Sequence, residues 1–155
     1  VEAMAKWALA PFENSTKSDA ENPYQIQHEL QDVMQDKVGI VRVEAEMEQA
    51  LEAVLAFRPR AEKVGVVGNR EYNPGWHTAM DLVNLLTVSE AVARAGIERK
   101  ESRGAHFRDD FPAKDANYGT FNTVLRKGAD GEMQVIREPI ADIRDDLKKI
   151  IKEMG

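Results

Sequence analysis

The sequence predicts a mainly α-helical protein: an antiparallel three-helix bundle followed by a small β-hairpin and a C-terminal helix. Three long segments place apolar residues at helical spacing, and short connections join them, which favours antiparallel neighbours. After Gly96 the pattern changes to two short strand-like runs around a turn, and a last amphipathic segment follows. The bundle is therefore expected to come first and the strands second.

The N-terminal segment is expected to lie outside the bundle. Residues 1–12 have the pattern of a short Ala-rich helix, which Pro11 is expected to stop. No initiator methionine is present, which fits the end of a helix from a longer chain, although processing of a complete protein is also compatible. Residues 13–22 are polar and lack periodicity. We assign residues 1–20 to the end of an upstream segment and a linker.

The predicted bundle spans residues 21–100, and its first helix has a defined start signal. Asn22 is expected to cap this helix and Pro23 to occupy its first turn, because these residue types are favoured there. The apolar spacing continues to about Lys37, and Gly39 then marks the end of the helix.

Two further helices complete the predicted bundle. Residues 44–58 have helical periodicity, and Pro59 is expected to stop or kink the helix. Residues 76–95 are apolar around much of the helical circumference, so this helix is expected to be the most buried. Between them, residues 61–74 mix valines with turn residues and are interpreted as a connector, with helical continuation through Val64 left open.

Residues 101–155 are expected to form a polar loop, a hairpin and a terminal helix that pack on the bundle as parts of one structural domain. Strand-like runs at residues 120–125 and 133–137 flank a turn rich in glycine and aspartate. The apolar positions that follow recur with a helical period and need a surface to cover: Ile140, Ile143, Leu147, Ile150 and Ile151.

The composition limits the function classes. The chain has 155 residues, of which 43% are hydrophobic, enough for the core of one domain. The absence of cysteine excludes disulfides, thiolate nucleophiles and cysteine-ligated clusters. A net charge of −6 argues against a nucleic-acid surface. No apolar run approaches the roughly 20 residues that span a bilayer, so direct membrane insertion is not expected.

No residue of this chain is predicted to be catalytic, to bind a cofactor or to bind a metal. His28, His77 and His106 lack the spacing that places two ligands on one helix face. His106, flanked by arginines, has the composition of an acid–base site, but no substrate-binding motif accompanies it. Residues 65–69 lack the glycine spacing of a dinucleotide-binding turn. A self-contained small enzyme that uses His106 is a third possibility, beside the two interpretations given below.

One segment carries a resemblance to a known family. Residues 101–112 read Glu-Ser-Arg-Gly-Ala-His-Phe-Arg-Asp-Asp-Phe-Pro, which resembles a signature in the C-terminal helical domain of succinate dehydrogenase and fumarate reductase flavoprotein subunits. Residues 21–24, 29–34 and 38–42 resemble the opening of the same domain, so the resemblance covers about residues 20–155. The matching domains of L-aspartate oxidase and adenylylsulfate reductase are related alternatives.

The resemblance implies a role within a larger enzyme. The parent protein would be an FAD-dependent succinate:acceptor oxidoreductase of electron transport and the citric acid cycle, with flavin and substrate residues in other domains. This chain would bind no cofactor and would be inactive alone. Its implied partners are the flavin-binding and capping domains of the parent chain and the iron–sulfur subunit. The implied location is cytoplasmic, peripheral at the inner face of a bacterial or archaeal membrane through partner subunits.

The same resemblance implies a domain-docking role for the polar loop. Its many forked donors and acceptors and its scarcity of apolar cover suit a polar interface with the flavin domain. A loop folded back on its own bundle is the other interpretation, and both roles can coexist. A free-standing helical interaction module is the rival from a different class. The residues assigned to docking are Glu101, Ser102, Arg103, Gly104, His106, Arg108, Asp110 and Pro112.

Overall fold

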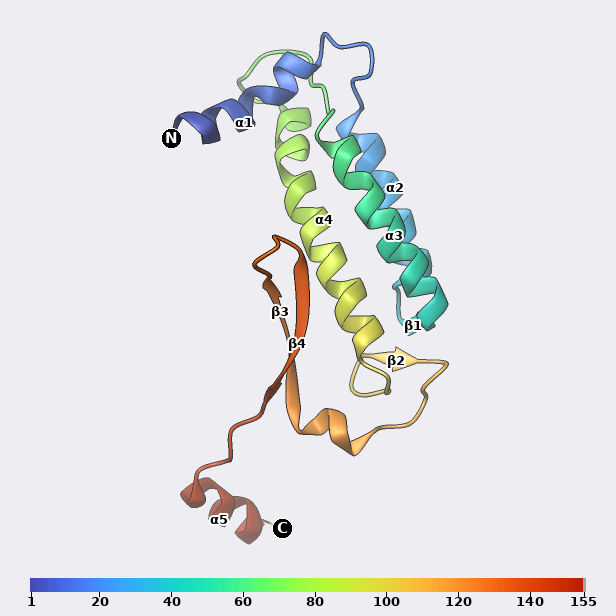
Figure 1. Ribbon diagram of the computed structural model, residues 1–155, viewed down its shortest axis with the longest axis vertical. Coiled ribbons are helices and arrows are strands. Elements are labelled where there is room, and N and C mark those ends of the chain that lie inside the picture. Colours follow the sequence, from blue (N-terminus) through green and yellow to red (C-terminus); the bar gives the residue numbers. More distant parts are fainter. Residues whose placement is uncertain (155) are drawn as a thin grey trace. The chain divides into compact units, whose positions relative to one another are not determined.

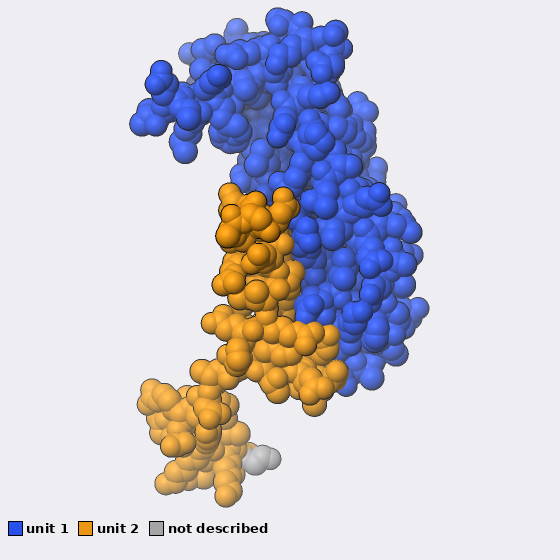
Figure 2. Space-filling view, viewed as in Figure 1, with its two compact units in different colours: residues 1–114 blue, residues 115–155 orange. Residues whose placement is uncertain are grey.

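The computed structural model describes residues 1–154, and the chain divides into two compact units, residues 1–114 and 115–155 (Figures 1 and 2). In chain order, the elements of the first unit are α1 (Glu2–Asn14), α2 (Pro23–Lys37), β1 (Val41–Arg42), α3 (Glu44–Ala61), α4 (Pro74–Glu98) and β2 (Phe107–Arg108). Those of the second unit are the short 3-10 helix η1 (Ala116–Gly119), β3 (Phe121–Lys127), β4 (Met133–Pro139) and α5 (Asp145–Met154).

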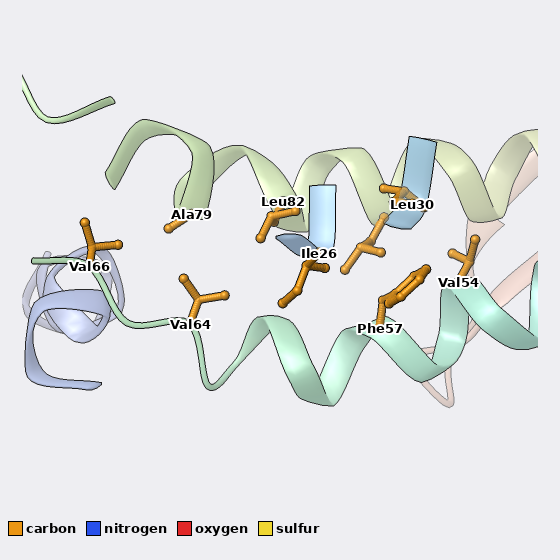
Figure 3. Packing of buried hydrophobic residues seen from close by; sticks show 9 residues of the cluster. Ile26, Leu30, Val54, Phe57, Val64, Val66, Ala79 and Leu82 are labelled. Carbon is orange, nitrogen blue, oxygen red and sulfur yellow. The ribbon is translucent and has the colours of Figure 1, made fainter. Parts of the chain in front are cut away.

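Helices α2, α3 and α4 lie side by side and form the predicted three-helix bundle (Figure 1). Their inward faces meet in one apolar core, shown in Figure 3, to which the connector after α3 adds two valines. The mainly α-helical fold class is confirmed. The buried core residues are Ile26, Leu30, Val54, Phe57, Val64, Val66, Ala79, Leu82 and Leu86.

The same capping signal begins two of these helices. The Asn22 side chain accepts a hydrogen bond from the backbone N–H of Tyr24 at 2.9 Å, and a proline follows the cap, as predicted. Asn73 accepts from the N–H of Trp76 at 3.0 Å, again with a proline directly after it. Helix α4 therefore begins two residues before the predicted start, because its Asn-Pro pair forms a cap and not only a turn.

The predicted helix stop at Pro11 is wrong, and so is the stop, one of the two alternatives predicted, at Pro59. Helix α1 continues through Pro11 to Asn14, and α3 continues through Pro59 to Ala61. Contacts with other segments hold the turns beyond both prolines. Asn14 is buried and donates to two backbone carbonyls just after α3, while the Arg60 side chain is held by two carboxylates. These tertiary contacts outweigh the hydrogen bond that each proline removes.

Helix α4 has more buried residues than α2 or α3, as predicted, although its burial is confined to one face. Leu82 and Leu86 face the core, but Leu85, Val88 and Val92 are exposed on a flank next to α2. Two neighbouring helices cover one side of α4 and leave this apolar flank open. The flank and α2 together line a shallow groove of about 210 Å³.

The predicted hairpin of the second unit is confirmed and is longer than expected. Strands β3 and β4 are antiparallel, with Phe121 opposite Pro139 and Lys127 opposite Met133. The predicted start of the terminal helix is wrong, because the Ile140 N–H donates to the Thr120 carbonyl at 3.0 Å and so continues the hairpin. Helix α5 begins at residue 145 instead, and its apolar side chains are exposed. Packing of the hairpin and α5 on the bundle stays a prediction.

Candidate interdomain docking site

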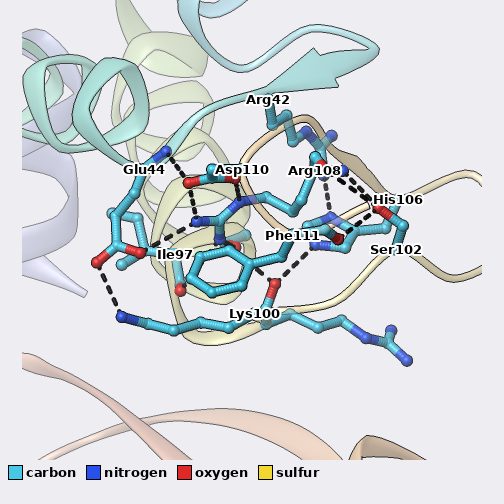
Figure 4. Close-up of polar contacts among 11 residues, drawn as sticks. Arg42, Glu44, Ile97, Lys100, Ser102, His106, Arg108, Asp110 and Phe111 are labelled. Atoms are coloured by element: carbon cyan, nitrogen blue, oxygen red, sulfur yellow. Dashed lines mark hydrogen bonds and ion pairs between the residues drawn. The ribbon is translucent and has the colours of Figure 1, made fainter. Parts of the chain in front are cut away.

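A short parallel strand pair joins two of the segments that carry the resemblance. In β1 and β2, Val41 lies opposite Phe107 and Arg42 lies opposite Arg108. The Asp109 N–H also donates to the Arg42 carbonyl at 3.0 Å. The pair therefore brings residues 38–42 against residues 101–112, which we call the docking loop (Figure 4).

Arg108 anchors the docking loop and is fully buried. Its guanidinium forks onto Asp110, with both N···O distances at 2.7 Å, and a second bond reaches Glu44 at 3.1 Å (Figure 4). It also donates to the Gly96 carbonyl at 2.9 Å and lies 4.9 Å from the ring centre of Phe111. These carboxylates raise the pKa of Arg108, Asp110 most strongly, so the charge is retained. One buried cation thus ties the loop to the end of α4 and the start of α3.

Asp110 completes the start of α3 from a distant part of the sequence. The residue before this helix, Val43, has no polar side chain to cap it. Asp110 supplies the missing acceptor, because its carboxylate receives the backbone N–H of Glu44 at 2.9 Å. The Arg108 hydrogen bonds, with help from this N–H, lower the pKa of Asp110 to about 2. The carboxylate is therefore ionised at neutral pH and serves both as cap and as counter-ion.

Ser102 closes the loop on itself. Its hydroxyl donates to the Phe111 carbonyl at 2.9 Å and accepts the Arg108 backbone N–H at 2.8 Å. The Ser102 N–H in turn donates to the Ala113 carbonyl at 3.1 Å. These bonds hold the two ends of the loop together. Pro112 lies exposed at the end of this closed segment.

Glu101 is buried between two arginines. Its carboxylate accepts from the Nε atoms of Arg103 at 2.8 Å and Arg99 at 3.2 Å. Arg103 and His106 exchange backbone hydrogen bonds across a tight turn, and Gly104 within it has a φ of 60°, which glycine adopts without strain. The buried carboxylate thus fixes two half-exposed guanidinium groups at the surface.

Both ring nitrogens of His106 are engaged. An arginine can only donate, so Nδ1 must accept from Arg42 at 3.0 Å, and Nε2 must carry the proton that reaches the Arg99 carbonyl at 3.0 Å. Burial lowers the pKa of His106, and the nearby arginine charges add to this effect against the opposing hydrogen bond to Arg99. His106 is therefore a neutral positioning group.

The structure brings most of the predicted docking residues into one connected network, and it adds partners that sequence reasoning missed. Glu44 and Phe111 contact the Arg108 guanidinium, and Arg42 contacts His106. Arg42 belongs to residues 38–42, which resemble the opening of the family's domain. That resemblance indicated the segment but assigned no role to Arg42. The loop is folded back on its own bundle. A docking role for its surface stays a prediction.

Gly65 has a packing role. Residues 65–69 lie in the connector after α3, without the strand and helix that flank a dinucleotide-binding turn. A Cβ added at Gly65 would lie 2.9 Å from the Ser15 Cα atom, so this glycine permits close approach of two backbone segments. These residues do not fit a flavin nucleotide. Within residues 1–154, no cluster of three or more His, Asp or Glu residues is arranged to hold a metal ion.

The fold and the loop define a helical domain whose polar loop is fixed at one end of a three-helix bundle. A family model described as the C-terminal part of fumarate reductase flavoprotein matches residues 27–148. The chain belongs to this family. The predicted resemblance is confirmed.

Relatives with curated names support the same family. The fumarate reductase flavoprotein subunit of Haemophilus influenzae is 33% identical over 121 residues, which cover 76% of this chain and 20% of that protein. The succinate dehydrogenase flavoprotein subunit of Coxiella burnetii is 33% identical over 113 residues, covering 72% of this chain and 19% of that protein. The chain thus spans about a fifth of the length of these relatives.

Solved structures share the fold. Mycobacterium smegmatis Sdh1 in complex with UQ1 has a TM-score of 0.89 and 40% identity, covering 97% of this chain and 26% of that chain. Adenylylsulfate reductase from Archaeoglobus fulgidus has a TM-score of 0.78 at 21% identity, covering 91% and 24%. The second likeness shows the fold alone, and it agrees with one of the predicted relatives.

Proposed function

We propose that this chain acts as the C-terminal structural domain of an FAD-dependent succinate dehydrogenase or fumarate reductase flavoprotein subunit. In this proposal the chain docks on the flavin-binding domain and buttresses it, while FAD and the substrate residues belong to other parts of the parent subunit. The observation that carries the proposal is the family match over residues 27–148 together with the 0.89 TM-score to Sdh1.

The chemistry of the loop supports a role without catalysis in this chain. Both nitrogens of His106 are occupied, and the Arg108 guanidinium is buried among two carboxylates and a carbonyl. A general acid or base needs an accessible group that can exchange a proton with the substrate. These side chains instead fix the shape of a surface.

Two kinds of surface are suited to docking. At the loop, Arg99 and Arg103 are held by Glu101 and remain partly exposed, so they can donate to acceptors on a partner. Along the bundle, the apolar flank of α4 adds area that favours burial. A polar rim beside an apolar strip is the usual composition of an interdomain interface. The residues that line the strip include Leu30, Met34, Leu85, Val88 and Val92.

The proposal extends to the assembly. The parent subunit would pass electrons from succinate through the flavin to an iron–sulfur subunit, or in reverse for fumarate reduction. It would lie on the cytoplasmic side of a bacterial or archaeal membrane, held there by partner subunits. Across residues 1–154, no helix is both long enough and apolar enough to cross a bilayer.

The proposal is tested by titrating this chain into the separately produced flavin-binding portion of the parent subunit in a calorimeter. We expect association, and we expect Arg103→Ala to weaken it about tenfold through loss of a charge-assisted hydrogen bond. Arg144→Ala, an exposed arginine in the second unit, is the matched control and should leave affinity unchanged.

Three outcomes would count against the proposal. Absence of binding at tens of micromolar, with both partners folded, would contradict docking and favour the free-standing interaction module. Tight binding of flavin by this chain alone, or succinate oxidation by it, would contradict the assignment of cofactor and catalysis to other domains.

A further inference from the structure

Arg42 bonds only to neutral acceptors. Its Nε donates to the carbonyls of Val38 at 3.2 Å and Gly39 at 2.9 Å, just beyond the end of α2. Its Nη1 donates to Nδ1 of His106 at 3.0 Å (Figure 4). Among residues 1–154, no carboxylate lies within ion-pair distance of Arg42. The other end of the Arg42 guanidinium is thus held in place without a hydrogen-bond acceptor among residues 1–154.

The neighbouring cations are bonded differently. Arg103 pairs with Glu101 at 2.8 Å, Lys100 with Glu44 at 2.9 Å, and Arg108 with Asp110 at 2.7 Å. Every one of these groups has a counter-ion in its own domain. The contrast sets Arg42 apart within the same cluster and indicates an acceptor supplied from outside.

The surroundings make the unpaired charge of Arg42 unfavourable. The side chain is half-buried, and Arg108 lies opposite Arg42 in the parallel strand pair. Burial lowers the pKa of Arg42, and the charge of Arg108 lowers it further. A carboxylate placed against the unused end of the fork would offset both effects, because an opposite charge favours the ionised form.

An apolar surface lies next to this group. Val41 and Phe107 are opposite each other in the parallel pair, on the same face, and are 57% and 39% exposed. Ile40, one residue earlier, is 82% exposed. A positioned arginine with large apolar neighbours is the usual composition of an energetically important interface centre.

We propose that Arg42, held in place by His106, binds an aspartate or glutamate side chain of the protein domain on which this chain docks. Ile40, Val41 and Phe107 then contact the apolar residues that flank this carboxylate. The inference rests on the proposed docking function and adds a recognition residue outside the docking loop. The partner segment is identified by its chemistry: one carboxylate with apolar neighbours.

The test compares two substitutions of Arg42 in the same calorimetric titration against the flavin-binding portion. Arg42→Gln removes the charge and should weaken association by tenfold to a hundredfold, the usual range for a charge-assisted hydrogen bond. Arg42→Lys keeps the charge and should recover part of the affinity. Arg70→Gln, in the connector between α3 and α4 at the opposite end of the bundle, is the matched control (Figure 1).

The lysine variant gives a second readout that names the partner residue. A zero-length carbodiimide reagent joins an amine to a carboxylate only when the two are in contact. Peptide mass spectrometry of the treated Arg42→Lys complex should show one new cross-link from the introduced lysine to an aspartate or glutamate of the flavin-binding portion. The wild-type complex should lack it. Thermal melts of both variants verify that the bundle remains folded.

The outcomes separate this inference from the docking proposal. If Arg42→Gln binds as tightly as wild type while Arg103→Ala binds weakly, docking stands and the role of Arg42 is wrong. If Arg42→Gln proves unfolded, the cross-link decides, and its absence in a folded Arg42→Lys complex overturns the inference. If wild type does not associate, the docking proposal fails and the inference fails with it.

Discussion

The chain contains the same local ion pair twice, in two very different settings. Arg108 and Asp110 are two residues apart and joined by a forked pair of hydrogen bonds, and so are Arg144 and Asp146. The Arg108 side chain is fully buried, whereas that of Arg144 is 79% exposed. Local sequence produces the fork in both places, and only the surroundings differ.

The difference lies in what else each guanidinium contacts. Arg108 adds Glu44, the Gly96 carbonyl and the Phe111 ring, whereas the Arg144 side chain pairs only with Asp146 among the described residues. Water competes for every hydrogen bond of the exposed pair and for few of the buried one. An ion pair of fixed geometry therefore contributes more to stability where other segments of the chain pack around it.

The largest expected effect comes from removing the buried cation. Arg108→Ala should lower the free energy of unfolding by about 3 kcal/mol, because it leaves two carboxylates and a carbonyl without their shared donor. Urea denaturation followed by circular dichroism measures this change. Arg144→Ala should cost about 0.5 kcal/mol or less. Equal losses would show that burial does not distinguish the two pairs.

Removal of the charge on Asp110 should have the next largest effect. Asp110→Asn should cost about 2 kcal/mol at pH 7, since it weakens the Arg108 fork and the cap of α3. The pKa of Asp110 is lowered from 3.8 to about 2, so its stabilisation is present above about pH 4 and is lost between about pH 4 and 2.

The free energy of unfolding measured at acid pH tests this predicted direction of the pH dependence. Wild type should lose stability between about pH 4 and 2 more steeply than Asp110→Asn, which cannot titrate there. The control Asp146→Asn should change stability by about 0.5 kcal/mol or less. A variant that parallels wild type through this range would disprove the assigned role of Asp110.

His106 should give a smaller, pH-dependent effect. His106→Gln should cost about 1 kcal/mol at pH 7. Because folding lowers the pKa of His106 below 6.5, its stabilisation is present above about pH 6.5 and falls as pH decreases below that value. Denaturation between pH 7.5 and about 5 should show a shallower slope in His106→Gln than in wild type. A His106→Gln slope equal to that of wild type would contradict this role of His106.

The smallest effect is expected in α5. Leu147 is exposed, so Leu147→Ala should change the free energy of unfolding by about 0.5 kcal/mol or less. The fully buried Leu82 provides the reference, and Leu82→Ala should cost about 3 kcal/mol. The same urea titrations measure both. A loss at Leu147 as large as that at Leu82 would mean that α5 packs against a surface in solution.

Much of the fold was predictable because its signals are local. The Asn22-Pro23 cap is confirmed, and the hairpin follows from two strand-like runs around a turn. The stop at Pro11 and the stop alternative at Pro59 were wrong, because residues far along the chain hold the turns beyond them. No short stretch of sequence around either proline contains the residues that make these contacts.

The candidate site was predictable only in part for the same reason. The resemblance selected the loop residues from 101 to 112, and contacts now connect most of them. Glu44 and Arg42 could not be assigned roles from sequence, since 64 residues separate each from the loop residue it bonds. Burial of Arg108 could not be predicted from sequence either, because the same Arg-x-Asp pattern is exposed at the start of α5, where Arg144 precedes the helix.

The sequence by itself determined the helices, their caps, the hairpin turn and the Arg-x-Asp forks, because each depends on residues within a few positions of one another. Only the tertiary structure decided which fork is buried, where helices continue past proline, and which arginine lacks a counter-ion. Those outcomes depend on desolvation and on donors and acceptors that the folded chain brings together from distant segments.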